Sequence, residues 1–449
     1  MSPKAIGISS RVSKLLGTAS LVVLGCVSPL AAQEAPITIV INQSPWFPGF
    51  QTVVEKYEAE TGNTVNLDVN PFAGSLEKQR TAVRSAESPF DLLIMNAGFF
   101  VEFYTGGFIN PLKEIDPDFE LSDDIFTFDD SVCWDAETFK ITCDGAGQLV
   151  TVPVNPFLPL LHYRSDLYEA NGLSVPTTWT QLYDNAKVLN DPPNMYGISQ
   201  RGQRGAFDVT FDVLPYIWSH GGGILADQKS GDFTVTINSP GTLAGMETYL
   251  KLAKDVGHPS TAGQTQTNVI QNMATGRAAH IQGVPAPAQF DDPTQSAVVG
   301  KIAYAVVPGS EEFGPAPGLG HWLAGVPKNI PDDRKKAAVA FLGWFQTDAA
   351  QRAYAEAGSP PVSRSVMTSE MADLEQFRYM RALAESIPKA RLTFVIPEAS
   401  QVLAVTELRL NQAIGGELPL KEALNTAAGE IAKIMKDAGY DAPQLDDLK

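Results

Sequence analysis

The sequence has few of the residues that usually carry catalysis or bind metals. Its 449 residues include three cysteines and five histidines, and no two histidines stand four residues apart as on a zinc-binding helix. It also lacks the G-x-S-x-G turn, the phosphate-binding P-loop and a strand-linked G-x-G-x-x-G. These absences argue against zinc hydrolases, serine hydrolases and nucleotide-dependent enzymes, and we expect neither a cofactor nor a metal. The paired carboxylates of a glycosidase stay open, because their separation is set in space rather than along the chain.

Basic residues are scarce as well. Lys and Arg number 33 against 51 Asp and Glu, which gives a formal net charge of −18. Residues 1–32 hold three basic residues and no acid, so the chain without them is more negative by three charges. This balance argues against nucleic acid or an anionic membrane as a partner, because both need a basic surface. The acidic stretch 116–130 lacks the order of a calcium-binding loop, and we interpret it as a solvated face.

No apolar run reaches the roughly 20 residues that a membrane-spanning helix needs. The apolar run 15–27 follows three basic residues and precedes a small-residue cut site. This pattern predicts that residues 1–32 are an export signal peptide, so that the mature protein begins near Gln33. The alternatives are a frayed N-terminal helix of a cytosolic protein and a lipid anchor at Cys26. We favour a free, exported protein over both.

Two cysteines remain beyond the signal peptide, Cys133 and Cys143. Exported proteins fold where thiols are oxidised, so this pair is predicted to form a disulfide. Closing so small a loop stabilises the fold by roughly 2–3 kcal/mol in the chain-entropy model. Two unpaired thiols are the alternative. A metal site is disfavoured, because the pair has no companion His or Cys at ligand spacing.

The remaining sequence alternates short buried strands with amphipathic helices. With 44% apolar residues the chain can bury a large core, and we expect it to split into two lobes. Strands are expected at 37–42, 64–69 and 90–95, with helices at 50–61 and 76–85. This alternation predicts parallel βαβ units and therefore an α/β fold. Ligands of such sheets lie beyond the carboxyl ends of strands, which here are residues 43–46 and 96–100.

Residues 147–189 carry the most specific pattern. In order, they contain Val152, Pro153, Tyr163, Arg164, Asp166, Leu167, Gly172, Leu173, Pro176, Thr178 and Trp179. This ordered set resembles the segment after the first hinge of family 1 extracellular solute-binding proteins, the sugar-binding components of bacterial ABC importers. Looser similarities extend over nearly the whole mature chain, including a helix start at residues 238–240 and the aromatic turn at 103–112.

The resemblance implies a two-lobe periplasmic-binding-protein fold, type II-like, with a hinge between the lobes. It assigns residues 33–152 and 290–347 to lobe 1, and residues 153–289 and 348–449 to lobe 2. The implied function is capture of a carbohydrate or polyol in the periplasm and delivery to the ABC transporter permease subunits in the inner membrane. The protein is then a monomer without enzymatic activity. Two other classes stay open: a secreted carbohydrate-active enzyme, and a sensory subunit that presents its ligand to a chemoreceptor.

Sugars and polyols offer hydroxyls to planar hydrogen-bonding groups and C–H faces to aromatic rings. Both kinds of side chain occur at the expected strand ends, at the hinge edges and in the segments that resemble ligand loops. The candidate ligand-binding residues are Gln43, Trp46, Asn96, Phe99, Asn155, Phe157, Arg201, Trp218, His321, Trp322 and Arg391. Each of these aromatic residues is open to ordinary core packing, and His321 to a purely structural role. Arg201 and Arg204 could both grip hydroxyls, or one of them could be a surface arginine in a Gly-rich loop. Trp179, at a helix start, is assigned to the core.

Overall fold

The computed structural model describes residues 34–205 and 207–449. The predicted signal peptide and its Cys26 lie outside these residues. Residues Glu34–Lys449 belong to one compact unit. Within the described part of the chain, no helix has both the length and the apolar character that crossing a membrane requires.

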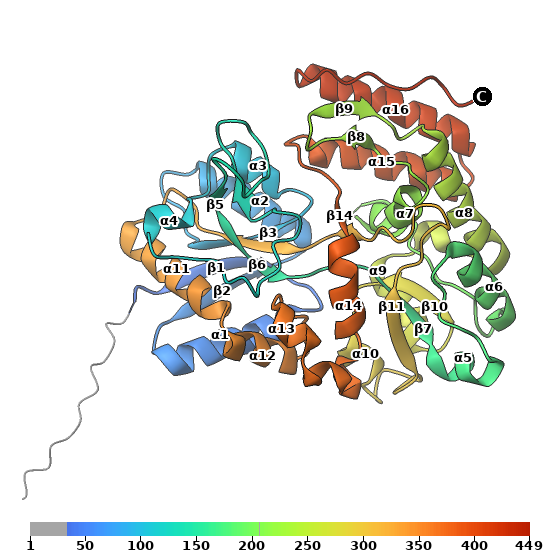
Figure 1. Ribbon diagram of the computed structural model, residues 1–449, viewed down its shortest axis with the longest axis horizontal. Coiled ribbons are helices and arrows are strands. Elements are labelled where there is room, and N and C mark those ends of the chain that lie inside the picture. Colours follow the sequence, from blue (N-terminus) through green and yellow to red (C-terminus); the bar gives the residue numbers. More distant parts are fainter. Residues whose placement is uncertain (1–33, 206) are drawn as a thin grey trace, which may run out of the picture. The chain divides into compact units, whose positions relative to one another are not determined.

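A five-stranded sheet organises the first group of elements (Figure 1). Its strand order is β2 (Val65–Asn70), β1 (Ile37–Asn42), β3 (Leu92–Asn96), β13 (Trp322–Gly325) and β6 (Thr151–Asn155). β1 is parallel to β2 and β3, as the alternation predicted, whereas β13 is antiparallel to β3 and β6. Insertion of this late strand pairs Trp322 with both Asn96 and Asn155. Residues far apart in the sequence therefore meet at one edge of the sheet.

Helices from both ends of the chain accompany this sheet. They are α1 (Phe47–Thr61), α2 (Phe72–Arg84), α3 (Phe100–Thr105), α4 (Leu112–Ile115), α11 (Asp332–Phe345), α12 (Asp348–Glu356) and α13 (Arg364–Thr368). α1 begins three residues before its predicted start and carries Pro48 in its first turn, where no N–H is needed. α2 begins four residues early, because Gly74 and Ser75 are weak helix formers that hid its first turn from the pattern.

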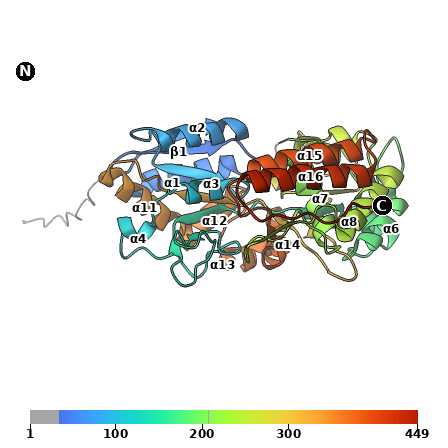
Figure 2. The same ribbon diagram turned by 90° about the horizontal axis from the view of Figure 1, so that it is seen from above.

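A three-stranded antiparallel sheet organises the second group, in the order β10 (His280–Gly283), β7 (Leu160–Arg164) and β11 (Ile302–Val306). Its helices are α5 (Ser165–Asn171), α6 (Trp179–Leu189), α7 (Asp208–Trp218), α8 (Pro240–Val256), α9 (Gln266–Ala274), α15 (Ala399–Ile414) and α16 (Leu420–Asp437). Figure 2 shows α15 and α16 side by side. α6 starts where Thr178 predicted, since the Thr178 hydroxyl accepts the Gln181 N–H at 3.3 Å.

The remaining strands and α-helices are short. They are β4 (Cys133–Trp134), β5 (Gln148–Leu149), β8 (Leu225–Asp227), β9 (Asp232–Val235), α10 (Pro287–Phe290), β12 (Gly318–Leu319), α14 (Met380–Ser386) and β14 (Arg391–Leu392). The predicted disulfide between Cys133 and Cys143 is confirmed, and it lies beside the β4–β5 pair.

The buried apolar residues form two main clusters. The first contains Phe50 and Phe341 and extends to Ile302 of the three-stranded sheet, and the second contains Tyr216 and Leu424. The chain passes from the first group to the second between β6 and β7, returns between β11 and β13, and crosses again after α13, because α14 packs against β11. Residues 290–347 supply strands to both sheets, and α12 packs against α1. The residue bounds of the two lobes stay a prediction.

Candidate functional site

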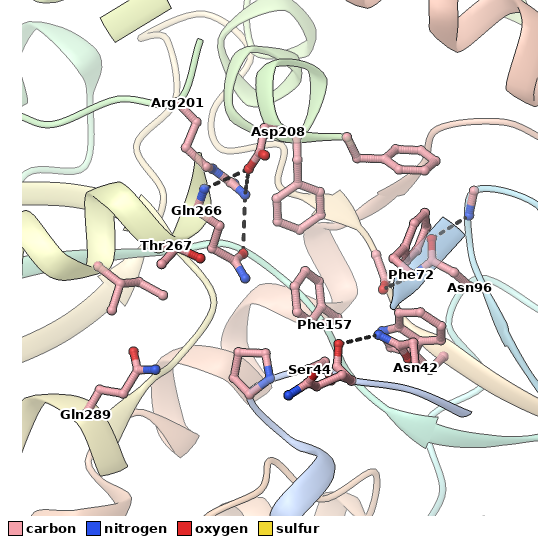
Figure 3. A pocket seen from close by; sticks show the side chains of 18 of the residues that line it. Asn42, Ser44, Phe72, Asn96, Phe157, Arg201, Asp208, Gln266, Thr267 and Gln289 are labelled. Atoms are coloured by element: carbon pink, nitrogen blue, oxygen red, sulfur yellow. Dashed lines mark hydrogen bonds and ion pairs between the residues drawn. The ribbon is translucent and has the colours of Figure 1, made fainter. Parts of the chain in front are cut away.

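A cavity of about 360 Å³, the main cavity, lies where β1 and β3 end and where α7 and α9 begin. One side, the sheet wall, consists of Asn42, Gln43, Ser44, Phe72, Asn96, Gly98, Gly320 and Trp322. The other side, the helix wall, consists of Arg201, Phe207, Asp208, Phe211, Gln266, Thr267, Ile270, Gln271 and Ala274. Figure 3 shows the two walls with Phe157 between them.

The sheet wall is uncharged and is held by backbone contacts. Asn96 ends β3; its Nδ2 donates to the Gly320 carbonyl and its Oδ1 accepts from the Gly98 N–H, both at 3.0 Å. Asn42 ends β1 and donates through Nδ2 to the Gln43 carbonyl at 3.2 Å. The Asn96 bond to Gly320 joins the loop after β3 to the loop before β13, whereas the Asn42 bond lies within the turn after β1. Side-chain groups next to them therefore have fixed positions.

The helix wall carries charged groups that pair with one another. The Arg201 side chain is buried, and its Nη1 donates to Gln266 Oε1 at 3.3 Å. Its guanidinium lies 3.8 Å from Asp208 Oδ1 and 3.7 Å from Asp212 Oδ1. Asp208 also accepts the Gln266 N–H at 2.7 Å, which ties the start of α7 to the start of α9. The Arg201 guanidinium carbon lies 4.9 Å from the centre of the Phe211 ring.

Burial governs the ionisation of this wall. It raises the pKa of Asp208, and the Arg201 charge opposes that rise. Burial also raises the pKa of Asp212, behind the wall, to about 7. Glu407 accepts the Gly205 N–H at 2.7 Å, and burial raises its pKa to about 7 as well. Among the described residues that line the cavity, Arg201 and Asp208 are the only charged ones, so its lining is electrically balanced.

Aromatic rings give the cavity its apolar surface: Phe72, Phe157, Phe207, Phe211 and Trp322. Two glycines let these rings approach the backbone. A Cβ on Gly98 would lie 1.9 Å from Phe207 Cζ, and a Cβ on Gly320 would lie 2.7 Å from Phe211 Cε2. Phe207 lines this cavity and has a positive φ of 66°. This backbone conformation is uncommon for a bulky residue and is often found at functional sites.

Several polar atoms of cavity-lining side chains are buried without a hydrogen-bond partner among the described residues. They are Asn42 Oδ1, Ser44 Oγ, Arg201 Nε, Arg201 Nη2 and Trp322 Nε1. Such groups are uncommon in folded proteins because each forfeits the hydrogen bonds it makes in water. Both walls carry donors among these atoms, and the sheet wall adds acceptors, a combination that suits a ligand with several hydroxyls.

A second cavity of about 300 Å³ adjoins the first. The two share Ser44, Pro45, Phe157, Gln289 and Gln295. The second cavity also reaches Trp46, whose ring centre lies 5.7 Å from that of Trp322, and Asn155 at the end of β6. Asn155 Nδ2 donates to Tyr354 Oη and to the Pro360 carbonyl, both at 3.3 Å.

The structure brings together seven of the residues that the sequence nominated. Gln43, Asn96, Phe157, Arg201 and Trp322 line the main cavity, and Trp46, Asn155 and again Phe157 line the adjoining one. Their contact with a ligand stays a prediction. Arg204, the neighbour of Arg201, is exposed and lines neither cavity.

Four nominated residues lie elsewhere. Phe99 is buried against Phe72, with ring centres 5.8 Å apart. Trp218 and Arg391 line a separate cavity of about 410 Å³. His321 is enclosed by the core and shares a hydrogen bond of 2.7 Å with Ser131 Oγ, and burial lowers its pKa to about 3.

The assignment of Trp179 to the core is confirmed. Its ring stacks on Tyr216 with centres 3.7 Å apart, and its Nε1 donates to Ser219 Oγ at 2.8 Å. Trp46 and Trp322 are equally enclosed, with 2% and 3% of their surface exposed against 3% for Trp179. Burial alone therefore does not separate a core tryptophan from one beside a cavity.

Most of the helix wall was not nominated from the sequence. The missed residues Asp208, Phe211, Gln266 and Gln271 come from α7 and α9, and the polar residues of α9 have the spacing of a solvated helix face. The one local signal was a Thr265-x-x-Asn268 capping box, which marks the start of α9 but not what that start contacts. In the described part of the chain, no cluster of three or more His, Cys, Asp or Glu side chains could hold a metal ion.

Comparison with known proteins places this geometry in context. A solute-binding protein of Agrobacterium radiobacter K84, solved with ribitol, superimposes with a TM-score of 0.75 and 22% identity, over 90% of this chain and 99% of that one. A maltose-bound protein of T. maritima gives a TM-score of 0.76 and 22% identity, over 88% and 98%. Both show the fold, and the two-lobe α/β architecture implied by the sequence is confirmed.

Sequence comparison points to the same class of protein as the structural matches. The erythritol/L-threitol-binding protein of Mycolicibacterium smegmatis is 20% identical over 420 residues, covering 87% of this chain and 83% of the relative. The model of the family described as bacterial extracellular solute-binding protein matches residues 42–352, well over half of the chain. The chain belongs to the bacterial extracellular solute-binding protein family.

Proposed function

We propose that this protein captures an uncharged polyhydroxylated solute, a sugar alcohol or monosaccharide, for an ABC importer. The solute would occupy the main cavity and contact both walls. Because the walls come from the two groups of elements, a ligand that bridges them stabilises the closed arrangement. That arrangement, carried by a monomer in the periplasm, would dock on the permease subunits in the inner membrane.

The single observation behind this proposal is the chemistry of the main cavity. Among the described residues that line it, five aromatic rings occur beside polar atoms without partners, and the one cation is balanced by the one acid. Aromatic faces suit the C–H surface of a polyol, and the free donors and acceptors suit its hydroxyls. An anionic sugar would have to compete with Asp208 and Asp212 for Arg201, so the site favours a neutral one. Of the named relatives, one is an erythritol/L-threitol-binding protein, one was solved with ribitol and one with maltose.

Binding without turnover is part of the proposal. Hydrolysis of a glycosidic bond needs two carboxyl groups that flank the bond. Among the described residues that line either cavity, Asp208 is the only carboxylic acid. Its carboxylate is engaged with Arg201 and the Gln266 N–H, which supports a positioning role rather than proton transfer.

A thermal-shift screen followed by calorimetry tests the proposal. The panel contains erythritol, L-threitol, ribitol, D-mannitol, D-glucose, maltose, D-gluconate and glucose 6-phosphate. A ligand present at 100 times its Kd adds about 2.7 kcal/mol to the free energy of unfolding. We expect at least one neutral polyol or monosaccharide to do so, and neither anion. Preference for an anion would contradict the neutral site, and release of product from aryl glycosides would favour the enzyme. If cells that lack the gene for this protein still take up the ligand, a sensory role would be favoured.

A further inference from the structure

The cavity beside the main one has an unusual wall. Its sixteen lining residues include six prolines: Pro45, Pro48, Pro156, Pro285, Pro287 and Pro360. We call it the proline cavity. It is lined further by the rings of Trp46 and Phe157 and by the aliphatic Val284, Ala286 and Ala288. Among the described lining residues none is charged.

This wall can pair few hydroxyl groups. Proline has no backbone N–H, so six positions contribute no amide donor. Asn155 already donates to Tyr354 Oη and the Pro360 carbonyl, and Gln295 donates to Asp292 Oδ2 at 2.5 Å. Ser44 and Gln289 lie at the boundary, since both also line the main cavity. A second sugar ring placed here would bury hydroxyls that the wall leaves unpaired, which weakens binding.

An apolar group, in contrast to a sugar ring, needs no hydrogen bonds from this wall. A benzene-sized ring fits within about 300 Å³ and would contact proline rings, Trp46 and Phe157. The shared residues make the proline cavity continuous with the main cavity, so one molecule can occupy both. We infer that the proline cavity takes the apolar substituent of a ligand whose hydroxyl-bearing part occupies the main cavity. The ligand class is then an aryl or short alkyl glycoside, or the corresponding polyol ether. This inference rests on the proposed function.

Matched pairs of compounds test it by calorimetry. Each pair shares its polyol part and differs in the substituent: methyl and phenyl D-glucopyranoside, D-galactopyranoside and D-mannopyranoside in both anomeric forms, and 1-O-methyl and 1-O-benzyl D-mannitol. In at least one pair we expect the aromatic member to bind at least tenfold more tightly, from burial of one ring. Equal or weaker binding of every aromatic member overturns the inference, and so does a tenfold preference for maltose over methyl D-glucopyranoside. If no member of any pair binds, the proposed function itself fails.

Ala288 supplies the matching variants, because it is exposed and lines the proline cavity but not the main one. Ala288→Phe fills the space and should reduce the ratio between the paired affinities to about one. Ala170→Phe, at an exposed position of α5 outside both cavities, is the control and should keep the ratio. Ala288→Leu repeats the occlusion with a smaller side chain should the phenylalanine impair folding. A ratio that survives both occluding variants places the apolar group elsewhere and overturns the inference.

Discussion

The sheet wall and the helix wall enclose the same cavity with different chemistry. The sheet wall presents neutral amides, a hydroxyl and an indole, whose positions are fixed by strand ends and backbone hydrogen bonds. The helix wall presents a buried guanidinium held by two carboxyl groups. A neutral polar atom without a partner contributes no hydrogen bond to the stability of the fold, so it is available to a ligand. The buried ion pair matters for stability as well as for affinity, because removal of one partner leaves the other charge uncompensated. Substitutions in the two walls should therefore separate stability from affinity.

The largest effect is expected from Arg201→Met. The change leaves Asp208 and Asp212 buried without their cation, so the free energy of unfolding should fall by about 3–5 kcal/mol. Urea unfolding measures this, and calorimetry on the folded fraction should show weaker binding as well. Arg204→Met, three residues along the same loop but exposed, is the control and should change stability by no more than about 0.5 kcal/mol. Equal losses in the two variants would contradict the conclusion that the buried charge of Arg201 stabilises the fold.

Loss of the disulfide should come next, and it should act on stability alone. The double variant Cys133→Ser, Cys143→Ser opens a loop with a sequence separation of 10, which should lower the free energy of unfolding by about 2–3 kcal/mol. The bond lies outside the lining of both cavities, so the Kd of the folded protein should not change. The wild type under reducing conditions provides a second measurement. A changed Kd with unchanged stability would mean that this loop acts on the sheet wall.

A smaller, pH-dependent effect is expected from His162 in β7, behind the helix wall. Burial lowers its pKa to about 3, so the folded protein keeps it neutral where the unfolded chain protonates it below about 6.5. Stability attributable to His162 is therefore lost as pH falls from about 6.5 towards 3, by up to about 1.4 kcal/mol per pH unit. Asp212 and Glu407, with pKa values raised to about 7, act in the opposite direction and lose stability as pH rises from about 4 to 7.

His162→Phe isolates the histidine contribution. The ring packs against Phe290 and Tyr304, and neither ring nitrogen has a hydrogen-bond partner among the described residues, so the substitution removes the titration without removing a bond. Urea unfolding at pH 4.5, 5.5 and 6.5 should give a shallower loss of stability towards acid than in the wild type. Identical slopes would show that His162 is protonated in the folded protein over this range.

The smallest effect is expected from Ser44→Ala in the sheet wall. Ser44 Oγ is buried and has no partner among the described residues, so the melting temperature of the free protein should stay within a degree or two or rise. Affinity for a polyol identified in the screen should fall by about 1 kcal/mol, the usual net contribution of one hydrogen bond. Together with Arg201→Met, this variant shows whether the two walls divide folding and binding as their chemistry suggests. A stability loss without a change in affinity would assign Ser44 to the fold.

The sheet wall was predictable because its chemistry follows a local rule. Parallel strands carry their polar ends to one edge, so Gln43 and Asn96 could be nominated from the residues that end β1 and β3. The antiparallel insertion of β13 between β3 and β6 was not predictable in this way, since strand order depends on contacts across more than two hundred residues. Trp322 was nominated by resemblance, and the inserted strand explains how it reaches Asn96.

The helix wall was hidden because its signals are not local. Asp208 lies in the first turn of α7, where an acidic residue also suits the helix dipole, and nothing in the sequence tells these two roles apart. The polar residues that α9 turns to the cavity have the spacing of a solvated face. Trp218 was nominated from the sequence but lies away from the main cavity. It precedes a run of glycines in a segment that resembles a ligand loop, yet together with Arg391 it lines the cavity of about 410 Å³.

The closeness of Trp46 and Trp322 also makes the molecule its own optical reporter. Their ring centres are 5.7 Å apart, one ring lines each cavity, and both indole N–H groups lack a partner among the described residues. Indole emission shifts with local polarity and hydrogen bonding, so a ligand in the main cavity should act first on Trp322, and its apolar substituent on Trp46. The other four tryptophans line neither of these cavities and contribute a constant background. A change in the intrinsic fluorescence of the unlabelled protein can thus report that a candidate compound has entered these two cavities.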